Sequence, residues 1–275
     1  MMNFRKVVDI FILFFSRKKI VANIQLLETN KRLSDKKIII TGGSRGIGLA
    51  MAKKFVSEGA IVLITGRCED SLKKASKEAQ CKYLVMDIQD VDSFDNLLDR
   101  AEKELGKIDC LVNNAGISLH EKTFFEVTQE TFDKQIGTNF RGPFFLTQLF
   151  VKRLKKKKQE GNVLFISSET GITKDIRPYG YSKAAINSMV EGLAYDFAKD
   201  NIRINAIAPG ITATEMTGFS AKENLYCKRN MLERIYLPEE IAETACFLLS
   251  DVSGCISGQI IACNNGRSIN SRLKK

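Results

Sequence analysis

From Lys36 onward, the chain alternates short runs of β-branched and other apolar residues with longer segments whose apolar residues recur every three or four positions. The strand candidates span residues 37–41, 60–65, 82–86, 109–113, 162–167, 203–208 and 259–263. Three of them read KIIIT, AIVLIT and DCLVN, and such nearly continuous apolar runs are typical of parallel strands covered by helices on both faces. Helical spacing between the strands is clear at 47–57 and 93–105 and weaker at 71–79. The alternation predicts a doubly wound α/β fold with a seven-stranded parallel sheet flanked by helices.

The organisation of the chain follows from the extent of this pattern. Of 275 residues 44% are apolar, which is enough for an ordinary globular core and excludes general disorder. No repeat, proline-rich linker or low-complexity tract interrupts residues 36–266, so we predict one domain there. Residues 1–35 form a basic and apolar N-terminal extension, and residues 267–275 a basic C-terminal tail.

The net charge of +10 belongs to the two ends of the chain. Residues 1–40 carry nine Lys/Arg and three Asp/Glu, and residues 267–275 carry four Lys/Arg and no acid. The remaining body has 29 basic and 29 acidic residues and is therefore neutral. A neutral body offers little surface to a nucleic acid, so we do not expect a nucleic-acid partner.

The N-terminal extension contains the apolar run Val7–Phe15, broken only by Asp9 and flanked by basic residues. Nine residues are too few to span a bilayer, which needs about 20. The segment is compatible with an interfacial membrane helix, with a helix docked on this protein or a partner, with an export signal, or with a frayed end. No small-residue cleavage pattern follows it, which weighs against export. We therefore expect a cytoplasmic protein that contacts a membrane, if at all, peripherally through residues 4–19.

The seven cysteines are scattered, with no C-x-x-C pair, and the only histidine is His120. A disulfide framework or a zinc site needs close, repeated spacing, so the pattern predicts buried free thiols in a reducing compartment and no metal. A single histidine also makes a Ser-His-Asp triad improbable.

A glycine-rich loop follows the first predicted strand, where residues 41–48 read TGGSRGIG and lead into a helix. Glycines at this spacing let the backbone turn sharply and approach a ligand, while the helix start offers free N–H groups to a pyrophosphate. A purely structural turn is the alternative. The position between strand and helix favours a dinucleotide site.

The end of the second predicted strand bears on the choice of nucleotide. Enzymes that use NAD place an acidic residue there for the ribose 2′-hydroxyl, but this chain has Gly66 and then Arg67, with Arg45 inside the glycine loop. Two guanidinium groups suit a 2′-phosphate, so NADP(H) is favoured and NAD(H) stays an alternative. Glu69 and Asp70 are expected in the first turn of the next helix.

Tyr179 and Lys183 lie four residues apart in a predicted helix and share one face of it. An ammonium group nearby favours the phenolate and lowers the pKa of the tyrosine from about 10 towards working pH, which makes the hydroxyl a usable general acid or base. Tyr181 lies only two positions from Lys183 and points away from it.

These motifs together resemble the short-chain dehydrogenase/reductase family over about residues 35–266. TGGSRGIG is similar to the family's TGxxxGxG loop, Asn113–Gly116 to its NNAG segment, residues 209–214 to its PGxxxT, and Tyr179–Lys183 to its YxxxK, with Ser168 upstream. The resemblance implies a single Rossmann-type domain, an NAD(P)-dependent oxidoreductase acting on CH–OH groups (1.1.1.-), and assembly as a homotetramer or homodimer.

The resemblance also implies residue roles. Tyr179 protonates the carbonyl oxygen, Lys183 binds the nicotinamide ribose, Ser168 hydrogen-bonds the developing oxyanion, and Asn139 holds a water that links Lys183 to solvent. The implied cofactor-binding residues are Gly42, Ser44, Arg45, Gly46, Ile47, Gly48, Arg67, Asp87, Ile88, Asn113, Ala115, Gly116, Tyr179, Lys183, Pro209, Gly210, Thr212 and Thr214.

Two departures from the family pattern bear on these roles. Ser168 precedes Tyr179 by 11 residues where most relatives have 13, which implies a shorter intervening loop, and Ser167 competes for the catalytic role. The S-x-x-G pattern with Gly171 favours Ser168. The usual VDGG is replaced by CNNG at 263–266, which leaves the packing near the cofactor or the subunit interface open.

The substrate is the least determined property. Residues 214–237 are expected to form a lid that mixes apolar and charged side chains, which suggests a partly apolar substrate. The run of cations at 152–158 could attract an acidic carrier, but it is more simply a solvated helix end that complements the helix dipole. We predict a carbonyl reductase or alcohol dehydrogenase most like the 3-oxoacyl-[acyl-carrier-protein] reductases, with a substrate that is carrier-bound or free. The alternatives are a sugar, steroid or polyol dehydrogenase and a non-catalytic dinucleotide-binding regulator.

Overall fold

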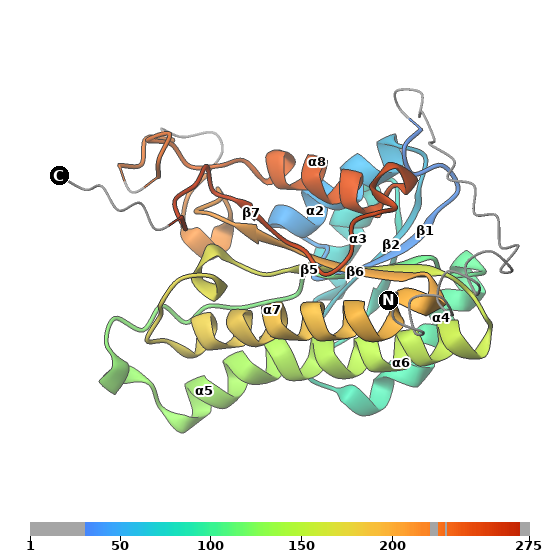
Figure 1. Ribbon diagram of the computed structural model, residues 1–275, viewed down its shortest axis with the longest axis horizontal. Coiled ribbons are helices and arrows are strands. Elements are labelled where there is room, and N and C mark those ends of the chain that lie inside the picture. The colour runs from blue at the N-terminus through green and yellow to red at the C-terminus, as the bar shows by residue number, and fades with distance from the viewer. Residues whose placement is uncertain (1–30, 221–224, 229, 270–275) are drawn as a thin grey trace, which may run out of the picture.

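The computed structural model describes residues 31–220, 225–228 and 230–269, and its centre is a seven-stranded parallel sheet in the order β3-β2-β1-β4-β5-β6-β7 (Figure 1). The strands are β1 (Lys37–Thr41), β2 (Ile61–Gly66), β3 (Lys82–Val85), β4 (Cys110–Asn113), β5 (Gly161–Ile166), β6 (Ile202–Pro209) and β7 (Ile260–Cys263). All seven predicted strands are confirmed, and their ends agree within one residue. The order reverses between β1 and β4, so a crevice opens there at the carboxyl ends of the strands.

Helices cover both faces of this sheet, as Figure 1 shows. They are α2 (Gly46–Ser57), α3 (Glu69–Ala79), α4 (Phe94–Leu105), α5 (Gln129–Ile136), α6 (Gly142–Lys156), α7 (Pro178–Phe197) and α8 (Pro238–Leu249). The predicted helix 71–79 begins two residues earlier because Glu69 and Asp70 occupy its first turn, where carboxylates complement the helix dipole.

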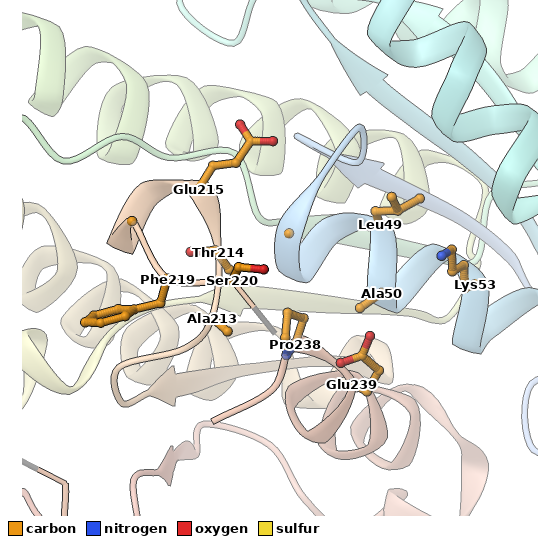
Figure 2. Close-up of a pocket in the computed structure, with 12 residues that line it drawn as sticks. Leu49, Ala50, Lys53, Ala213, Thr214, Glu215, Phe219, Ser220, Pro238 and Glu239 are labelled. Atoms are coloured by element: carbon orange, nitrogen blue, oxygen red, sulfur yellow. The ribbon is translucent and has the colours of Figure 1, made fainter. Parts of the chain in front are cut away.

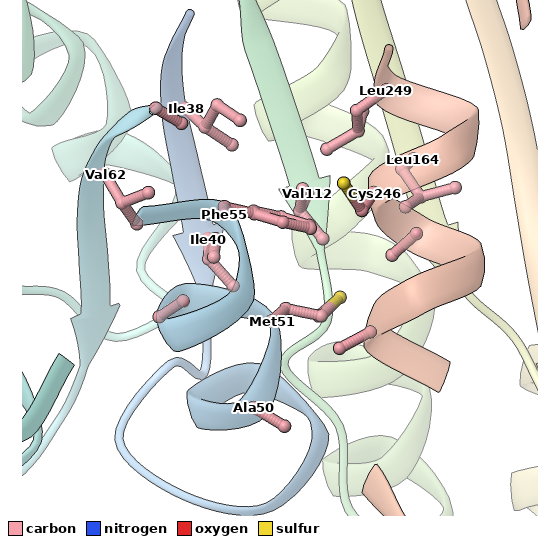
Figure 3. Packing of buried hydrophobic residues seen from close by; sticks show 14 of the residues in the cluster. Ile38, Ile40, Ala50, Met51, Phe55, Val62, Val112, Leu164, Cys246 and Leu249 are labelled. Carbon is pink, nitrogen blue, oxygen red and sulfur yellow. The ribbon is translucent and has the colours of Figure 1, made fainter. Parts of the chain in front are cut away.

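The apolar run in β1 shows why the strand sequences do not alternate with polar residues. Ile38 and Ile40 belong to one buried cluster, which includes Met51 of α2 and Cys246 of α8 (Figure 3). Ile39 points to the opposite face, into a second cluster formed with α4, α6 and α7. Successive side chains of a strand face opposite sides, so two apolar layers require a continuous apolar run.

The first described residues contact the end of α2 and the helix α8, since Arg32 hydrogen-bonds both Glu58 and Glu243. Leu33 is fully buried in the first cluster, and Arg32 donates through Nη2 to Glu58 Oε1 at 2.6 Å. Glu58 is buried, and the hydrogen bond from Arg32 lowers its pKa to about 2. Residues just before the predicted start of the domain therefore pack with it. The predicted membrane contact through residues 4–19 lies outside the described residues, and no helix among those described is long and apolar enough to cross a membrane.

The cations near the end of α6 lie towards the amino ends of the strands, because α6 leads into the start of β5. Lys155 pairs with Asp200 at 2.8 Å and Lys157 with Glu102 at 2.7 Å. Much of this charge is thus neutralised locally, which favours a solvated helix end over a carrier-binding patch.

All seven cysteines are free. The prediction of buried thiols is wrong for Cys68 and Cys255, which are exposed, while Cys110 and Cys246 are buried. Cys68 precedes α3 and Cys255 lies in the turn before β7, where short connections run over the surface.

Candidate active site

Most of the predicted motifs lie at the carboxyl ends of the strands, and the Tyr179–Lys183 motif lies in the first turns of α7. The glycine loop follows β1, Arg67 follows β2, Asp87 follows β3, Ser168 follows β5 and Gly210 follows β6. Because all seven strands are parallel, these residues meet at one edge of the sheet. The fold therefore brings together motifs that are separated by up to 170 residues in the sequence.

The glycine loop is locked to the end of β4 by two residues to which the sequence analysis assigned no role. Thr41 Oγ1 accepts from the backbone N–H of Asn114 at 3.0 Å and of Ala115 at 3.1 Å. In return, Asn114 Nδ2 donates to the carbonyls of Thr41 and Gly42, both at 2.9 Å. Both residues belong to motifs that the sequence analysis identified, Thr41 to TGGSRGIG and Asn114 to NNAG. Only the structure shows that the two motifs are hydrogen-bonded to each other.

At its glycine positions the loop has no room for a side chain. Gly42 and Gly46 have positive φ values of 66° and 54°, which L-residues rarely adopt. A Cβ on Gly48 would lie 2.3 Å from the Gly42 carbonyl oxygen. The first turn of α2, with Ile47 half-buried in it, contains no acidic residue, so its N–H groups are open to an anion. Ser44 is half-buried just before the turn.

The two predicted nucleotide-selecting arginines are both exposed. Arg45 forms an ion pair with Glu215, in the segment after β6. Arg67 has no ion-pair partner among the described residues. An ion pair between exposed side chains contributes about 1 kcal/mol or less, so Arg45 can exchange Glu215 for a stronger anion at little cost.

The end of β4 carries one buried polar atom that has no hydrogen-bond partner among the described residues. Asn113 Nδ2 donates to Thr147 Oγ1 at 2.9 Å, but the buried Asn113 Oδ1 has no partner among the described residues. On the β3 side, Gln89 N donates to Asp87 Oδ1 at 3.0 Å and Ile88 is buried. A buried acceptor without a partner is costly and is expected to bind a ligand.

The segment after β6 closes the other side of the crevice. Gly210, which follows Pro209, packs directly on the Tyr236 ring, where an added Cβ would lie 2.8 Å from a ring carbon. Thr212 Oγ1 donates to the Gly210 carbonyl at 2.9 Å, and Thr214 faces Gly46 of the glycine loop. This segment thus turns back over the loop that follows β1.

The two candidate serines have different surroundings. Ser167 Oγ donates to Asn187 Oδ1 of α7 at 2.6 Å, which places this hydroxyl in the packing between β5 and α7. Ser168 Oγ accepts from Thr170 N at 3.2 Å and from Thr170 Oγ1 at 3.0 Å, and it lies near enough to the Tyr179 hydroxyl to lower the pKa of that tyrosine. The structure therefore brings Ser168, rather than Ser167, to Tyr179.

Tyr179 and Lys183 lie on one face of α7, as their spacing predicts, and Lys183 Nζ is 5.7 Å from the centre of the Tyr179 ring. Tyr181 is 47% exposed on the other side of the helix. Burial raises the pKa of Tyr179 above its usual value, although the nearby Ser168 hydroxyl and the charge of Arg177 oppose this shift. Burial lowers the pKa of Lys183 to about 8, and its ammonium donates to the Ile166 carbonyl at 2.7 Å. Before any ligand binds, burial thus outweighs the expected lowering of the pKa of Tyr179.

Asn139 is buried in a five-residue π-helical segment, Gly137–Arg141, between α5 and α6. Its side chain holds both backbone groups of Ile117, accepting from N at 2.8 Å and donating to O at 2.9 Å. Gly116 lies between Asn139 and Lys183, since a Cβ there would be 3.4 Å from Asn139 Oδ1 and 3.6 Å from Lys183 Nζ. π-helical insertions occur frequently at functional sites, and this one turns Asn139 towards the segment after β4.

The CNNG departure has a partner in the fold. Asn264 Nδ2 donates to Glu169 Oε2 at 3.3 Å, and Arg267 forms an ion pair with the same carboxylate. Glu169 and Asn264 are both buried. An aspartate at position 264 would place a second negative charge against Glu169, whereas the amide donates to it.

A cavity of about 540 Å³ lies beside the crevice, between α2, the segment after β6 and the start of α8 (Figure 2). Thr214 and Gly46 line it, but Ser168, Tyr179 and Lys183 do not. Across the crevice, His120 Nε2 hydrogen-bonds the Met216 carbonyl at 2.8 Å, although His120 has a positive φ of 59°. This contact joins the segment after β4 to the segment after β6.

Comparison with known proteins agrees with this geometry. A family model described as Enoyl-(Acyl carrier protein) reductase matches residues 42–268. The chain is 32% identical to the 3-oxoacyl-[acyl-carrier-protein] reductase FabG of Aquifex aeolicus, over 86% of this chain and 98% of that protein. It is 34% identical to a 3alpha-hydroxysteroid dehydrogenase of Mediterraneibacter gnavus, over 84% and 96%.

Among solved structures, the 3-ketoacyl-(acyl-carrier-protein) reductase from Brucella melitensis, complexed with NADH, superimposes with a TM-score of 0.79 at 30% identity. The match covers 86% of this chain and all of that one. The chain therefore belongs to the short-chain dehydrogenase/reductase family of oxidoreductases.

Proposed function

We propose that this protein interconverts a carbonyl group and a secondary alcohol with a nicotinamide cofactor, and that it prefers NADP(H) to NAD(H). The observation that carries the proposal is the meeting of Ser168, Tyr179 and Lys183 at the sheet edge where the glycine loop ends. Relatives that reduce 3-oxoacyl groups or oxidise hydroxysteroids support the reaction class.

The residues at the crevice fit such a cofactor. The N–H groups at the start of α2 and the side-chain-free surface of Gly42, Gly46 and Gly48 would hold the pyrophosphate. The unsatisfied Asn113 Oδ1 would accept from a ribose hydroxyl, and Lys183 would donate to the ribose next to the nicotinamide. When bound, the nicotinamide ring supplies or accepts the hydride.

The residues of the protein would act on the Tyr179 hydroxyl proton and on the negative charge that develops on the substrate oxygen. Tyr179 keeps its proton at neutral pH, since burial raises its pKa, and would give it to the substrate oxygen during reduction. Ser168 would donate to the same oxygen as its negative charge grows. Lys183, with a pKa of about 8, is still mainly protonated at pH 7, and its ammonium would stabilise the phenolate that remains. Asn139 holds the segment that borders this site.

The preference for NADP(H) rests on Arg45 and Arg67. Both are exposed at the end of the crevice where the strands β1 and β2 finish, and neither is tied to a buried carboxylate. We expect Arg67→Gln to weaken NADPH binding about tenfold and to leave NADH binding unchanged, because only NADPH carries a 2′-phosphate. Fluorescence titration measures both constants, with Arg100→Gln on α4 as the matched control. Equal loss of NADPH and NADH affinity would refute this selective role.

For the substrate, we propose a 3-oxoacyl thioester, carrier-bound or free. Apolar side chains are exposed on the segments that surround the site, with Ile172 and Ile176 before Tyr179 and Met216 and Phe219 after β6. They favour a substrate with an apolar part over a sugar or polyol. A screen of NADPH oxidation with 3-oxoacyl thioesters, ketosteroids and keto sugars tests this choice. Turnover of keto sugars alone would overturn it.

We also propose that the protein assembles as a homodimer or homotetramer. Phe132 of α5 and Tyr195 of α7 are exposed, and Tyr195 is 87% accessible. Exposed aromatic side chains of this kind are expected to be buried against another copy. Light scattering coupled to gel filtration measures the assembly, and a monomer at micromolar concentration would contradict the proposal.

Tyr179→Phe tests the reaction itself. We expect turnover to fall at least 10³-fold while NADPH affinity stays within about twofold, because the substitution removes only the transferable proton. Tyr181→Phe, two residues away and exposed, is the matched control and should keep wild-type activity. A Tyr179→Phe protein that is still active would refute the proposed mechanism. A wild-type protein without turnover on any of the screened substrates would favour the non-catalytic alternative.

A further inference from the structure

The loop between Ser168 and Tyr179 holds a carboxylate and a guanidinium in a fixed geometry. Arg177 Nε donates to Asp175 Oδ1 and Arg177 Nη2 to Asp175 Oδ2, both at 2.8 Å. Asp175 Oδ1 also accepts from the backbone N–H of Ile176 at 2.7 Å and of Arg177 at 3.2 Å. The Asp175 side chain is only 7% exposed and that of Arg177 is 30% exposed. Parallel hydrogen bonds of this kind fix the orientation of the guanidinium plane.

This ion pair rests on the first turn of α7. Gly180 follows Tyr179 directly, and a Cβ on it would lie 2.2 Å from Asp175 Cβ and 2.6 Å from Asp175 Oδ2. Arg177 is itself the residue that precedes the helix, with an extended backbone. The absence of a side chain at Gly180 therefore lets Asp175, and with it the paired Arg177, pack against the turn of α7 that carries Tyr179.

Three charged groups besides this pair's own members bear on Tyr179 or its neighbours. Lys183 contacts the ring from α7, and Glu169 lies on the segment after Ser168. Glu169 is in turn paired with Arg267 from the segment after β7. The positive charge of Arg177 lowers the pKa of Tyr179, while Asp175 and Glu169 raise it. Two carboxylates thus lie near the phenol, and each has its own arginine.

We propose that Arg177 is a positioning residue that, together with Lys183, stabilises negative charge on the Tyr179 oxygen, and that Asp175 holds its guanidinium in place for this purpose. The inference rests on the proposed role of Tyr179 as the proton-transferring group. It assigns a purpose to the shortened loop, which places a cation two residues before the tyrosine. Without Arg177, Asp175 would face the phenol as an uncompensated negative charge and disfavour the phenolate.

The test is the pH profile of kcat/KM for oxidation of the alcohol, in which Tyr179 must first lose its proton. Arg177→Met should move the acidic limb of the profile up by about one pH unit, so that the rate below the limb falls about tenfold. Arg177→Lys keeps the positive charge but loses the two parallel hydrogen bonds to Asp175. Its acidic limb should therefore lie at least halfway back from the Arg177→Met position to that of wild type. Arg177→Met combined with Asp175→Asn removes both charges and should return the limb close to its wild-type position.

Controls separate this electrostatic role from a structural one. Arg153→Met removes an arginine that pairs with Asp95 and Asp99 of α4, and it should leave the profile unchanged. Thermal melting and NADPH titration show whether each variant is folded. A uniform loss of kcat/KM at every pH, with no movement of the limb, would overturn the inference. If Tyr179→Phe is inactive and Arg177→Met has a wild-type profile, this inference fails alone; if Tyr179→Phe is active, the proposed mechanism fails first.

Discussion

Ser167 Oγ donates a hydrogen bond to Asn187 Oδ1 at 2.6 Å, so the hydroxyl of the serine next to Ser168 is engaged by a residue of α7 eight positions after Tyr179. The two adjacent serines thus meet different residues of α7, which distinguishes a serine that packs against the helix from one that lies near Tyr179. The contact also shows why the two serines should respond differently to the same substitution.

Ser168→Ala should lower kcat about 10²- to 10³-fold, because it removes a hydrogen-bond donor aimed at the developing charge. Ser167→Ala should keep kcat within about threefold and cost roughly 1 kcal/mol of unfolding free energy, since it loses one buried hydrogen bond. Steady-state kinetics and urea unfolding of both variants measure these effects. A kinetic loss confined to Ser167→Ala would reverse the assignment.

Lys183→Met should stabilise the cofactor-free protein by roughly 1 kcal/mol at pH 7 while abolishing turnover, because a buried ammonium is replaced by an apolar side chain of similar length. The sign follows from the pKa of Lys183, which burial lowers from 10.5 to about 8 in the folded state. Burying the protonated Lys183 therefore lowers the stability of the folded protein at neutral pH. This cost disappears as pH rises from about 8 to 10.5, because the folded protein releases the proton before the unfolded chain does.

Wild type should accordingly gain stability between about pH 8 and 10.5 from this group, and Lys183→Met should lack that gain. Thermal melting at several pH values measures it. A less stable Lys183→Met protein would mean that the hydrogen bond to the Ile166 carbonyl outweighs the cost of burying the charge.

Arg32→Met should destabilise the protein by about 1–2 kcal/mol, because it leaves the buried Glu58 carboxylate with Lys54 alone. The pKa of Glu58 is lowered to about 2, so its stabilising effect is present above its usual value of 4.5 and is lost as pH falls towards 2. The acid-unfolding midpoint of Arg32→Met should therefore move to higher pH. Lys53→Met breaks only the exposed pair with Glu78 and is the control that should change nothing.

Gly48→Ala should abolish cofactor binding or unfold the loop, because its Cβ would lie 2.3 Å from the Gly42 carbonyl oxygen. Gly192→Ala in α7 is the matched control, since nothing lies within 4 Å of its added methyl group. That change should instead stabilise the protein by about 0.5–1 kcal/mol through reduced freedom of the unfolded chain. Calorimetric titration with NADPH and thermal melting check both, and wild-type affinity in Gly48→Ala would contradict the close approach.

The sequence alone determined the strands, most of the helices and the edge at which the site forms. Period and run length are local properties, so KIIIT already indicated a strand covered on both faces. The order of motifs placed Gly42 and Ser168 just after predicted strands. The spacing of Tyr179 and Lys183 likewise fixed a shared helical face without any knowledge of the fold.

Only the tertiary structure decided the contacts between segments that are distant in the chain. The lock between Thr41 and Asn114, 73 residues apart, and the pairing of Glu169 with Asn264 and Arg267 depend on how the sheet aligns its strand ends. The pKa of Tyr179 also depends on burial, which opposes the lowering that its neighbour Lys183 suggested. Local sequence determines where strands and helices form. Burial and hydrogen bonds between distant residues arise only when the folded chain brings those residues together.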